Sequence, residues 1–283
     1  MIDNKTIKIV NPNEDMQGNE KENIFLALES NNEYLAHSYV WPYENYHTCH
    51  AKPRNILIVV EVPQTNDFDI KKVRELLFKS ALERAYVLKE KLWKGQNTRI
   101  YSGATVERKD ILDFLASQGF VSDDSVFVME ALINSSFIRE IPLQYTIKKN
   151  PLNTDEDQEH FCKRHNSIFP TGIDKSKLNH FKSLNNWAFF SMYMDEKIVG
   201  ESMVFEKDKA GNIESFYILP EFRRTGAADV LMKYIFGYLF ECGYRKAELT
   251  VWERNKRAIR FYEKNGFKMT GEKPEEYPGI DVE

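Results

Sequence analysis

The sequence lacks any paired arrangement of cysteines. Its three cysteines, Cys49, Cys162 and Cys242, are odd in number, far apart and never spaced as C-x-x-C. This pattern argues against a disulfide framework and against a zinc site. We therefore expect three small, buried apolar side chains and no bound metal.

It also lacks a long hydrophobic run and a surplus of one charge. The longest purely aliphatic run is ILIVV at 56–60, far too short to cross a bilayer, and the N-terminus has no cationic start followed by an apolar stretch. The 39 basic and 43 acidic residues leave a net charge of -4, which indicates neither a nucleic-acid nor a membrane partner. We expect a cytoplasmic protein in which any anion site is local.

The sequence does contain enough apolar material for a core. Hydrophobic residues make up 42% of its 283 residues, which is sufficient for one large domain or two ordinary ones. Apolar segments bounded by turn residues predict five strands, at 55–62, 188–194, 198–206, 213–219 and 246–252. Helical apolar spacing predicts one helix from about Val230 to Cys242 and a shorter one over 255–264. This alternation predicts an α/β fold.

The first half of the chain repeats the outline of the second. NILIVVEVP ends at Pro63 as IESFYILP ends at Pro220, and a short helix closes on Gly119 as the later one closes on Gly266. The prolines lie 157 positions apart and the glycines 147, so the first copy is ten residues longer, which we assign to a loop at 89–98. The repeat predicts two domains of one fold.

The boundary between the copies is expected just after Ile141-Pro142, because a new strand is predicted from Gln144 to Lys149. The predicted domains are therefore 1–142 and 143–283.

The segment RRTGAA, which begins at Arg223, lies between a predicted strand and a predicted helix. A helix N-terminus offers unsatisfied N–H groups and a positive dipole end, which together attract phosphate oxygens. Gly226, Ala227 and Ala228 are small enough for close approach, and the arginines add charge. Neither G-x-x-x-x-G-K-[ST] nor G-x-G-x-x-G occurs. Taken alone, the segment is equally compatible with an ordinary cationic turn.

The segment LPEFRRTGAA resembles the pyrophosphate-binding motif of the GNAT N-acetyltransferase superfamily, [Q/R]-x-x-G-x-[G/A], which is filled here by Arg223, Gly226 and Ala228. NKRAIRFYEKNGF, at 255–267, resembles the second signature of that family, in which an Asn, an Ala, a Tyr and a Gly-Phe recur at fixed spacing. The two motifs in this order are much more specific than either alone. The resemblance covers about residues 143–270 well and the first half only in outline.

The resemblance implies a mixed α/β (α+β) fold: two tandem GNAT-like domains, each with a mostly antiparallel central sheet flanked by helices. It also implies an acyl-CoA donor, with acetyl-CoA as co-substrate, whose pyrophosphate sits on the turn and whose pantetheine arm pairs with a splayed strand ending at Leu219. Backbone N–H groups near Ile218 and Leu219 would polarise the thioester carbonyl. The implied cofactor-binding residues are Ile218, Leu219, Arg223, Arg224, Thr225, Gly226, Ala227, Ala228, Asn255 and Tyr262.

Acyl transfer to an amine needs an unprotonated nucleophile, a donor to the oxyanion and a proton for the departing thiolate. By the resemblance, Tyr262 supplies that proton, since a phenol with a pKa of about 10 is protonated at neutral pH. Glu214 lies where several family members keep a base that deprotonates the amine. The alternatives are a core aromatic, a solvent-facing strand carboxylate and, for Asn255, a helix N-cap.

Three histidines fall in the predicted early helices of the second domain, which flank the acceptor site in the family: His160, His165 and His180. One of them is a candidate base or substrate contact. The simpler expectation is that they are surface histidines.

The first copy lacks the residues of the motifs. Counted from the prolines, Arg223, Gly226 and Ala228 correspond to Asn66, Asp69 and Lys71; counted from the glycines, Asn255 and Tyr262 correspond to Arg108 and Leu115. Asp67 and Asp69 would place negative charge where a pyrophosphate would sit. We expect a degenerate copy that is kept for structure, for shaping the acceptor pocket or for packing.

The second copy has no clear sequence signal for the last strand of its sheet. Little chain follows Phe267, whereas the first copy has a predicted strand at 126–133. We expect a stub at 280–283 or a strand supplied from elsewhere, including another subunit, so the sequence leaves a homodimer open.

The sequence thus predicts an N-acetyltransferase that moves an acetyl group from acetyl-CoA directly to the amine of a small molecule or peptide, without a covalent enzyme intermediate. The acceptor is not identified by the sequence. Two alternatives remain: a non-catalytic acyl-CoA sensor or scaffold, which would use the same turn, and a purely structural tandem domain.

Overall fold

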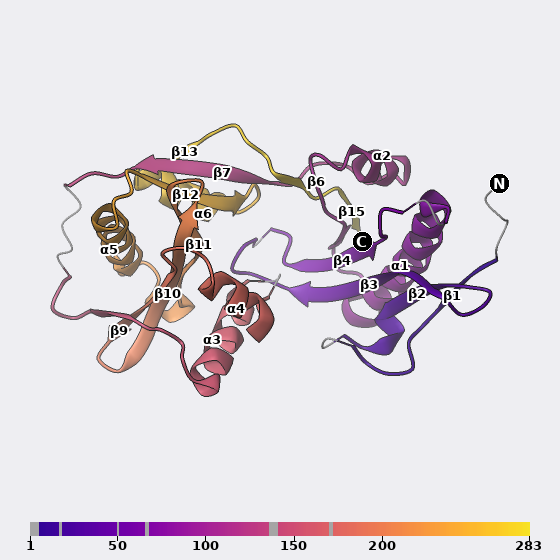
Figure 1. The fold of residues 1–283 in the computed structure, drawn as a ribbon, viewed down its shortest axis with the longest axis horizontal. Helices are drawn as coiled ribbons and strands as arrows, with labels where there is room; N and C mark the ends of the chain where they lie inside the picture. The colour runs from indigo at the N-terminus through magenta and orange to yellow at the C-terminus, as the bar shows by residue number, and fades with distance from the viewer. Residues whose placement is uncertain (1–5, 17–18, 50, 66–67, 136–140, 170–171) are drawn as a thin grey trace. The chain divides into compact units, whose positions relative to one another are not determined.

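The computed structural model describes the chain except residues 1–5, 17–18, 50, 66–67, 136–140 and 170–171, which are grey in Figure 1. The described chain divides into two compact units. Unit 1 comprises residues 1–124 together with 275–283, and unit 2 comprises residues 125–274. Each unit combines a mostly antiparallel sheet with helices, which confirms the predicted mixed α/β fold class.

The sheet of unit 1 has the strand order β1-β2-β3-β4-β5-β15. Its strands are β1 (Ile7–Val10), β2 (Ile24–Glu29), β3 (Tyr34–Glu44), β4 (Arg54–Glu61), β5 (Thr98–Tyr101) and β15 (Gly279–Val282). The short strands β6 (Ala104–Thr105) and β14 (Glu275–Glu276) pair with each other. Two α-helices, α1 (Ile70–Trp93) and α2 (Lys109–Ser117), and the 3-10 turn η1 (Lys21–Asn23) complete the described part of the unit.

The extra length of the first copy lies in a helix and not in the predicted loop at 89–98. Helix α1 has 24 residues, whereas its counterpart α5 (Ala227–Glu241) has 15. Its apolar face continues through Ala85 and Leu88, which pack in the core cluster of unit 1. Because these side chains keep helical spacing, the helix runs on to Trp93.

The sheet of unit 2 follows the order β7-β12-β11-β10-β9-β8, with β13 paired to β7. Its strands are β7 (Ser125–Leu132), β8 (Thr146–Lys149), β9 (Ala188–Met194), β10 (Lys197–Lys207), β11 (Ala210–Ile218), β12 (Lys246–Trp252) and β13 (Lys268–Met269). Its helices are α3 (Asp155–Ile168), α4 (Lys175–Lys182), α5 and α6 (Lys256–Lys264), with the 3-10 turn η2 (Pro220–Phe222) before α5. Figure 1 shows α5 and the α3–α4 pair beside this sheet.

The two sequence copies exchange their final strands. Strand β7, predicted as the last strand of the first copy, pairs along its length with β12 in unit 2, from Lys246↔Leu132 to Trp252↔Val126. In unit 1, β15 pairs with β5 from Gly279↔Tyr101 to Val282↔Thr98. The strand that completes the second sheet therefore comes from the first half of the same chain, which removes the sequence argument for a second subunit.

This exchange moves the boundaries between the compact units away from the predicted division at 142/143. The chain passes from unit 1 to unit 2 after Asp124 and returns at Glu275. The sequence pattern identifies β7 as a strand but does not say which edge it pairs with. The predicted stub at 280–283 is present as β15, and its Ile280 and Val282 pack against the core of unit 1.

The cysteines differ in part from expectation. All three are free, but only Cys49 is buried, Cys162 is half-buried and Cys242 is exposed at the C-cap of α5. Among the described helices, none is both long enough and apolar enough to span a membrane.

Candidate active site

Strands β11 and β12 run parallel but pair only at their beginnings. The two residue pairs that join them are Gly211↔Ala247 and Asn212↔Glu248, although β11 continues to Ile218 and β12 to Trp252. Across this fully described stretch, the edge of β11 from Ile213 onward has no partner on the β12 side. The pairing pattern is that of the splayed strands implied by the family resemblance.

The open edge offers one of the two predicted backbone donors. The N–H of Leu219 donates to the carbonyl oxygen of Val199 at 2.9 Å, so it is not free to polarise a thioester, and this part of the prediction was wrong. Because N–H directions alternate along an antiparallel strand, the N–H of Ile218 points to the opposite, open edge. At that edge the Ile218 carbonyl oxygen accepts a hydrogen bond from Arg223 Nε at 3.1 Å.

Close packing holds the end of β11 in place. Gly200 on β10 lies opposite Ile218, and a Cβ atom at Gly200 would lie 2.4 Å from both the Tyr217 carbonyl oxygen and Ile218 Cδ1. Only glycine fits such a backbone approach without displacing β11. The position of the open edge is therefore set by this contact.

The turn before α5 has the backbone that its sequence predicts. Gly226 is the N-cap with φ of 87°, and Arg224 has φ of 66°, so two left-handed residues lie within three positions. Thr225 Oγ1 donates to the carbonyl oxygen of Phe222 at 2.7 Å and closes the turn. Because the N-cap residue is a glycine, no side chain of that residue caps the helix. A Cβ atom added at Gly226 would meet nothing within 4 Å. The space beside Gly226 at the start of α5 is therefore open.

The two alanines of the turn have different environments. Ala227 is buried against the core of unit 2, whereas Ala228 is half-buried at the first turn of α5. The N–H of Ala227 makes only a long contact, 3.4 Å, with Thr225 Oγ1. Small size at Ala227 thus serves packing, and at Ala228 it leaves the helix end accessible.

Two arginines converge near this turn. Burial lowers the pKa of Arg223, and the charge of Arg257 on α6 lowers it further. Burial also lowers the pKa of Arg257. By surface area Arg257 is exposed and Arg223 is half-buried, and two neighbouring cations that oppose each other favour an anion between them. Arg257 was not among the predicted site residues, because it belongs to a different motif and only the fold brings it near Arg223.

Asn255 caps helix α6. Its Oδ1 accepts a hydrogen bond from the Ala258 N–H at 3.2 Å, which confirms the N-cap interpretation. This cap fixes the start of the helix that carries both Arg257 and Tyr262.

The Tyr262 ring is half-buried on α6 and not sealed in the interior. It packs with its centroid 5.6 Å from those of Phe261 and Phe267. Burial raises the pKa of Tyr262 to about 12. The phenol therefore keeps its proton throughout the neutral and mildly alkaline range, as a proton donor must.

Glu214 occupies a β-bulge. The β10–β11 register passes from Met203↔Ser215 to Val204↔Ile213, which leaves Glu214 without a partner opposite it. Bulges re-aim side chains and are frequent next to active sites. Burial raises the pKa of Glu214, although Lys177 and a hydrogen bond from Asn212 oppose this rise and the side chain still reaches solvent. A carboxylate with a raised pKa is a better base than an ordinary one.

A buried polar cluster lies beside the end of β11 and had no signal in the sequence. The Glu201 carboxylate on β10 is fully buried and accepts two hydrogen bonds from Arg164 of α3, at 3.1 and 2.8 Å. Ser191 Oγ donates to the same carboxylate at 3.1 Å, and the Tyr217 hydroxyl donates to it as well. The cluster ties α3 to three strands next to Ile218. Because its members lie up to 53 positions apart, only the pairing of strands reveals it.

The three histidines of the early helices differ in exposure. His160 and His180 are exposed, whereas His165 is buried, so the surface expectation was wrong for this residue. Burial lowers the pKa of His165 to about 4, and its Nδ1 lies 3.3 Å from Asn166 Oδ1. A neutral imidazole packed between Phe161 and Phe169 is a structural part of α3.

The corresponding turn in unit 1 has different chemistry. Asp69 is the N-cap of α1, and its carboxylate accepts from the Lys72 N–H at 3.1 Å, so this helix end already holds a negative charge. Leu115, the counterpart of Tyr262, is buried. Lys71 is exposed, and Asn66 and Asp67 lie outside the described residues.

Comparison with known proteins agrees with this arrangement in unit 2. Residues 154–267 match the sequence model of the acetyltransferase (GNAT) family. An uncharacterized N-acetyltransferase of Mycobacterium tuberculosis is 36% identical over 85 residues, which make up 30% of this chain and 54% of that protein. One from Archaeoglobus fulgidus is 42% identical over 59 residues, 21% of this chain and 40% of that protein. The chain spans about half the length of these curated relatives. The matches support GNAT-type acyl transfer as the chemistry of this segment.

Solved structures resemble the chain over nearly its whole length. A GCN5-related N-acetyltransferase from Sphaerobacter thermophilus aligns with a TM-score of 0.50 at 16% identity, covering 94% of this chain and 82% of that one. One from Kribbella flavida aligns with a TM-score of 0.51 at 9% identity, covering 91% and 59%. At these identities the likeness concerns the fold.

Proposed function

We propose that unit 2 is an N-acetyltransferase that transfers the acetyl group of acetyl-CoA directly to the amine of a small molecule or peptide. The observation that carries the proposal is the open, uncapped N-terminus of α5 at Gly226, which follows the unpaired edge of β11 and lies beside Arg223 and Arg257. Main-chain donors, a helix dipole and two cations form one site for a diphosphate.

The pantetheine arm pairs with the open edge of β11. This edge has main-chain groups but no partner strand beyond Asn212, so an extended amide-containing chain can complete its hydrogen bonds. The thioester carbonyl then lies near the Ile218 N–H, which stabilises the oxyanion as the amine attacks.

We assign the two proton transfers to Glu214 on β11 and to Tyr262 on α6. Glu214 accepts a proton from the attacking ammonium group, directly or through water, and the free amine forms a C–N bond to the acetyl carbon. The C–S bond breaks, Tyr262 donates its proton to the departing thiolate, and the nitrogen of the new amide releases its second proton to water, from which the phenolate of Tyr262 is protonated again. The raised pKa of Tyr262 keeps the phenol protonated at alkaline pH as well.

We further propose that unit 1 is a degenerate copy of the same fold that does not bind acyl-CoA. Its α1 N-terminus carries the Asp69 carboxylate where the diphosphate would have to sit, and like charges at such a distance repel. In this proposal unit 1 serves the structure, and β7, which follows it directly in the chain, completes the sheet of unit 2.

The test is release of free thiol from acetyl-CoA, corrected for hydrolysis, against a panel of primary amines. We expect turnover with at least one amine, and its loss in Glu214→Gln and Tyr262→Phe variants that still bind CoA by calorimetry. Retained CoA binding without turnover on any amine would favour an acyl-CoA sensor or scaffold. Absence of CoA binding in the folded protein would favour a purely structural role.

A further inference from the structure

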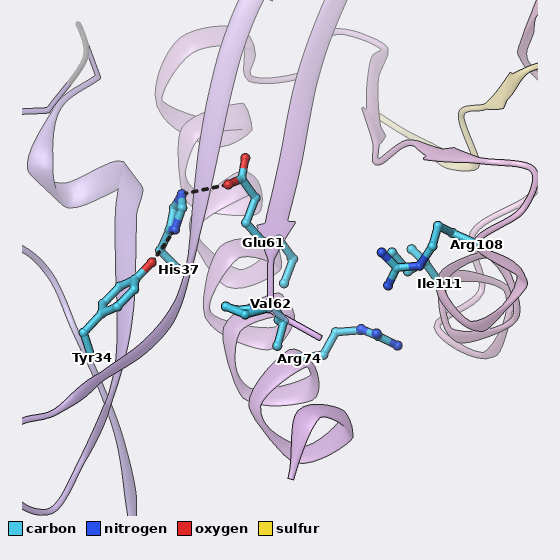
Figure 2. Close-up of a pocket in the computed structure, with 9 residues that line it drawn as sticks. Tyr34, His37, Glu61, Val62, Arg74, Arg108 and Ile111 are labelled. Carbon is cyan, nitrogen blue, oxygen red and sulfur yellow. Dashed lines mark hydrogen bonds and ion pairs between the residues drawn. The ribbon is translucent and has the colours of Figure 1, made fainter. Parts of the chain in front are cut away.

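Unit 1 contains a pocket of about 370 Å³ at the end of β4. Strand β4 pairs with β5 only from Asn55 to Leu57, and the pocket opens beyond that point, beside Val62 and Pro63. Its walls come from β3 and β4 on one side and from α1 and α2 on the other (Figure 2). It lies entirely within unit 1 and does not depend on acetyl transfer by unit 2.

One wall of the pocket is cationic. Arg74 of α1 is 9% exposed, and its Nη2 atom donates to Asp110 Oδ2 at 2.8 Å. Arg108 donates to both oxygens of the same carboxylate, at 3.0 and 3.2 Å. Hydrogen bonding from Arg108 lowers the pKa of Asp110 to about 2, so this carboxylate is ionised. Two guanidinium groups thus share one carboxylate, and the wall keeps one net positive charge.

The hydrogen bonds between described residues leave donors of both arginines for a ligand. A guanidinium group has five N–H donors, and Asp110 takes one from Arg74 and two from Arg108. Figure 2 shows both side chains directed from their helices into the same space.

The opposite wall carries the Glu61 carboxylate. Glu61 at the end of β4 lies 3.6 Å from His37 Nε2, and its side chain is 61% exposed. The Tyr34 hydroxyl lies 2.7 Å from His37 Nδ1, so the three groups form a chain along β3 and β4. Burial raises the pKa of Tyr39, and the negative charge of nearby Glu61 raises it further. Figure 2 shows the Glu61 carboxylate turned toward His37 on the wall formed by β3 and β4, while the two arginines extend from the opposite side of the pocket.

We propose that this pocket binds a small dipolar molecule with a carboxylate at one end and an ammonium group at the other. The carboxylate lies against Arg74 and Arg108, and the ammonium group lies against Glu61. Val62 and Ile111 supply apolar lining that suits intervening methylene groups.

The charge count separates this ligand from a phosphate. One net positive charge on the arginine wall matches a carboxylate, whose planar geometry also suits guanidinium donors. A phosphate dianion would leave one charge unmatched beside Asp110. An acyl-CoA is disfavoured because Asp69 already caps the α1 N-terminus.

The first experiment is calorimetric titration of the full chain at low ionic strength with the ω-amino acids from glycine to 6-aminohexanoate. Each has a matched monocarboxylate and a matched primary amine of the same carbon number, and inorganic phosphate is included. We expect at least one amino acid to bind at least about tenfold more tightly than its acid, its amine and phosphate.

Two variants assign the ends of the ligand. Arg108→Gln is expected to weaken binding of the amino acid and of the monocarboxylate but not of the amine. Glu61→Gln is expected to weaken binding of the amino acid and of the amine but not of the monocarboxylate. Lys91→Gln and Glu83→Gln make the same charge changes at exposed positions of α1 and should leave every affinity unchanged.

Several results would overturn the proposal. The first is that no amino acid binds, although the chain unfolds at its native temperature. The second is that phosphate or a monocarboxylate binds as tightly as the best amino acid. The third is that Glu61→Gln leaves the affinity for that amino acid unchanged. Thermal unfolding of each variant separates a lost ligand contact from a lost fold.

Discussion

Arg223 Nε donates a hydrogen bond to the carbonyl oxygen of Ile218, at 3.1 Å. This bond joins Arg223, which we assign to the diphosphate, to Ile218, whose N–H we assign to the thioester. The positions of the two groups are therefore fixed relative to each other. The guanidinium of Arg223 is thereby held in place before any ligand arrives.

Replacing Arg223 with alanine should raise the Kd for CoA by about tenfold or more, because a charge-assisted hydrogen bond contributes roughly 1.5 to 3 kcal/mol. Arg260 is an exposed arginine on α6, and Arg260→Ala is the matched control. Calorimetry on both variants checks the assignment. Equal loss in the two would mean that only net charge matters.

Gly226 permits a test that separates shape from charge. Asparagine and aspartate are similar in size, and both adopt left-handed backbone more readily than most residues. We expect Gly226→Asp to weaken CoA binding by well over about tenfold, through repulsion of the diphosphate, and Gly226→Asn to weaken it much less. If both folded variants bind CoA as the parent does, the diphosphate is not at this turn.

Tyr262→Phe should lower kcat by about a hundredfold and change KM for acetyl-CoA by no more than about twofold. The pKa of about 12 means that the parent enzyme keeps its phenol proton up to pH 10, so its kcat should rise with amine deprotonation and not decline there. The variant should fall furthest behind at alkaline pH, where no other acid is available to the thiolate. A pH–rate profile of both proteins measures this, and unchanged kcat would exclude Tyr262 as the proton donor.

His165 should make unit 2 acid-sensitive. Its pKa is about 4 in the folded protein against 6.5 ordinarily, so between these values the unfolded chain binds the extra proton and stability falls as pH falls. Between pH 7 and pH 5 this contributes a loss of roughly 2 kcal/mol in unfolding free energy. Denaturant unfolding at both pH values should show a smaller loss in His165→Gln than in the parent, whereas exposed His180→Gln should behave as the parent does.

Deleting residues 275–283 should loosen unit 1 and leave unit 2 largely intact. The deletion removes β15, which pairs with β5, and the Ile280 and Val282 side chains that pack on the unit 1 core. Hydrogen exchange should become faster at Ile100 on β5, while the amide of Leu249 on β12 serves as the internal control. Unchanged protection at Ile100 would show that β15 contributes little to that sheet.

The local features of the site could be predicted from the sequence because local chemistry determines them. A glycine before a helix and an asparagine three positions before Ala258 specify the left-handed N-cap and the side-chain cap, whatever surrounds them. The strand and helix order follows from apolar spacing for the same reason.

The remaining features depend on partners far away in the chain. Whether the Leu219 N–H is free depends on Val199, and the importance of Glu201 depends on Arg164, 37 positions earlier. The bulge at Glu214 depends on the β10 register. Sequence periodicity gives the face on which a side chain lies but not the strand that pairs with it, so the exchange of β7 and β15 was also missed.

The exchange of β7 and β15 determines the order in which the two units can fold during translation. A ribosome makes unit 2 as one continuous segment, and β7 is already available when β12 and β13 emerge. The edge of β5, by contrast, stays unpaired while the 177 residues from 102 to 278 are made, because only then are Gly279–Val282 translated. Unit 1 is therefore synthesised first, but its sheet is completed last. Until β15 pairs with β5, the edge of β5 is exposed to chaperones and to neighbouring strands.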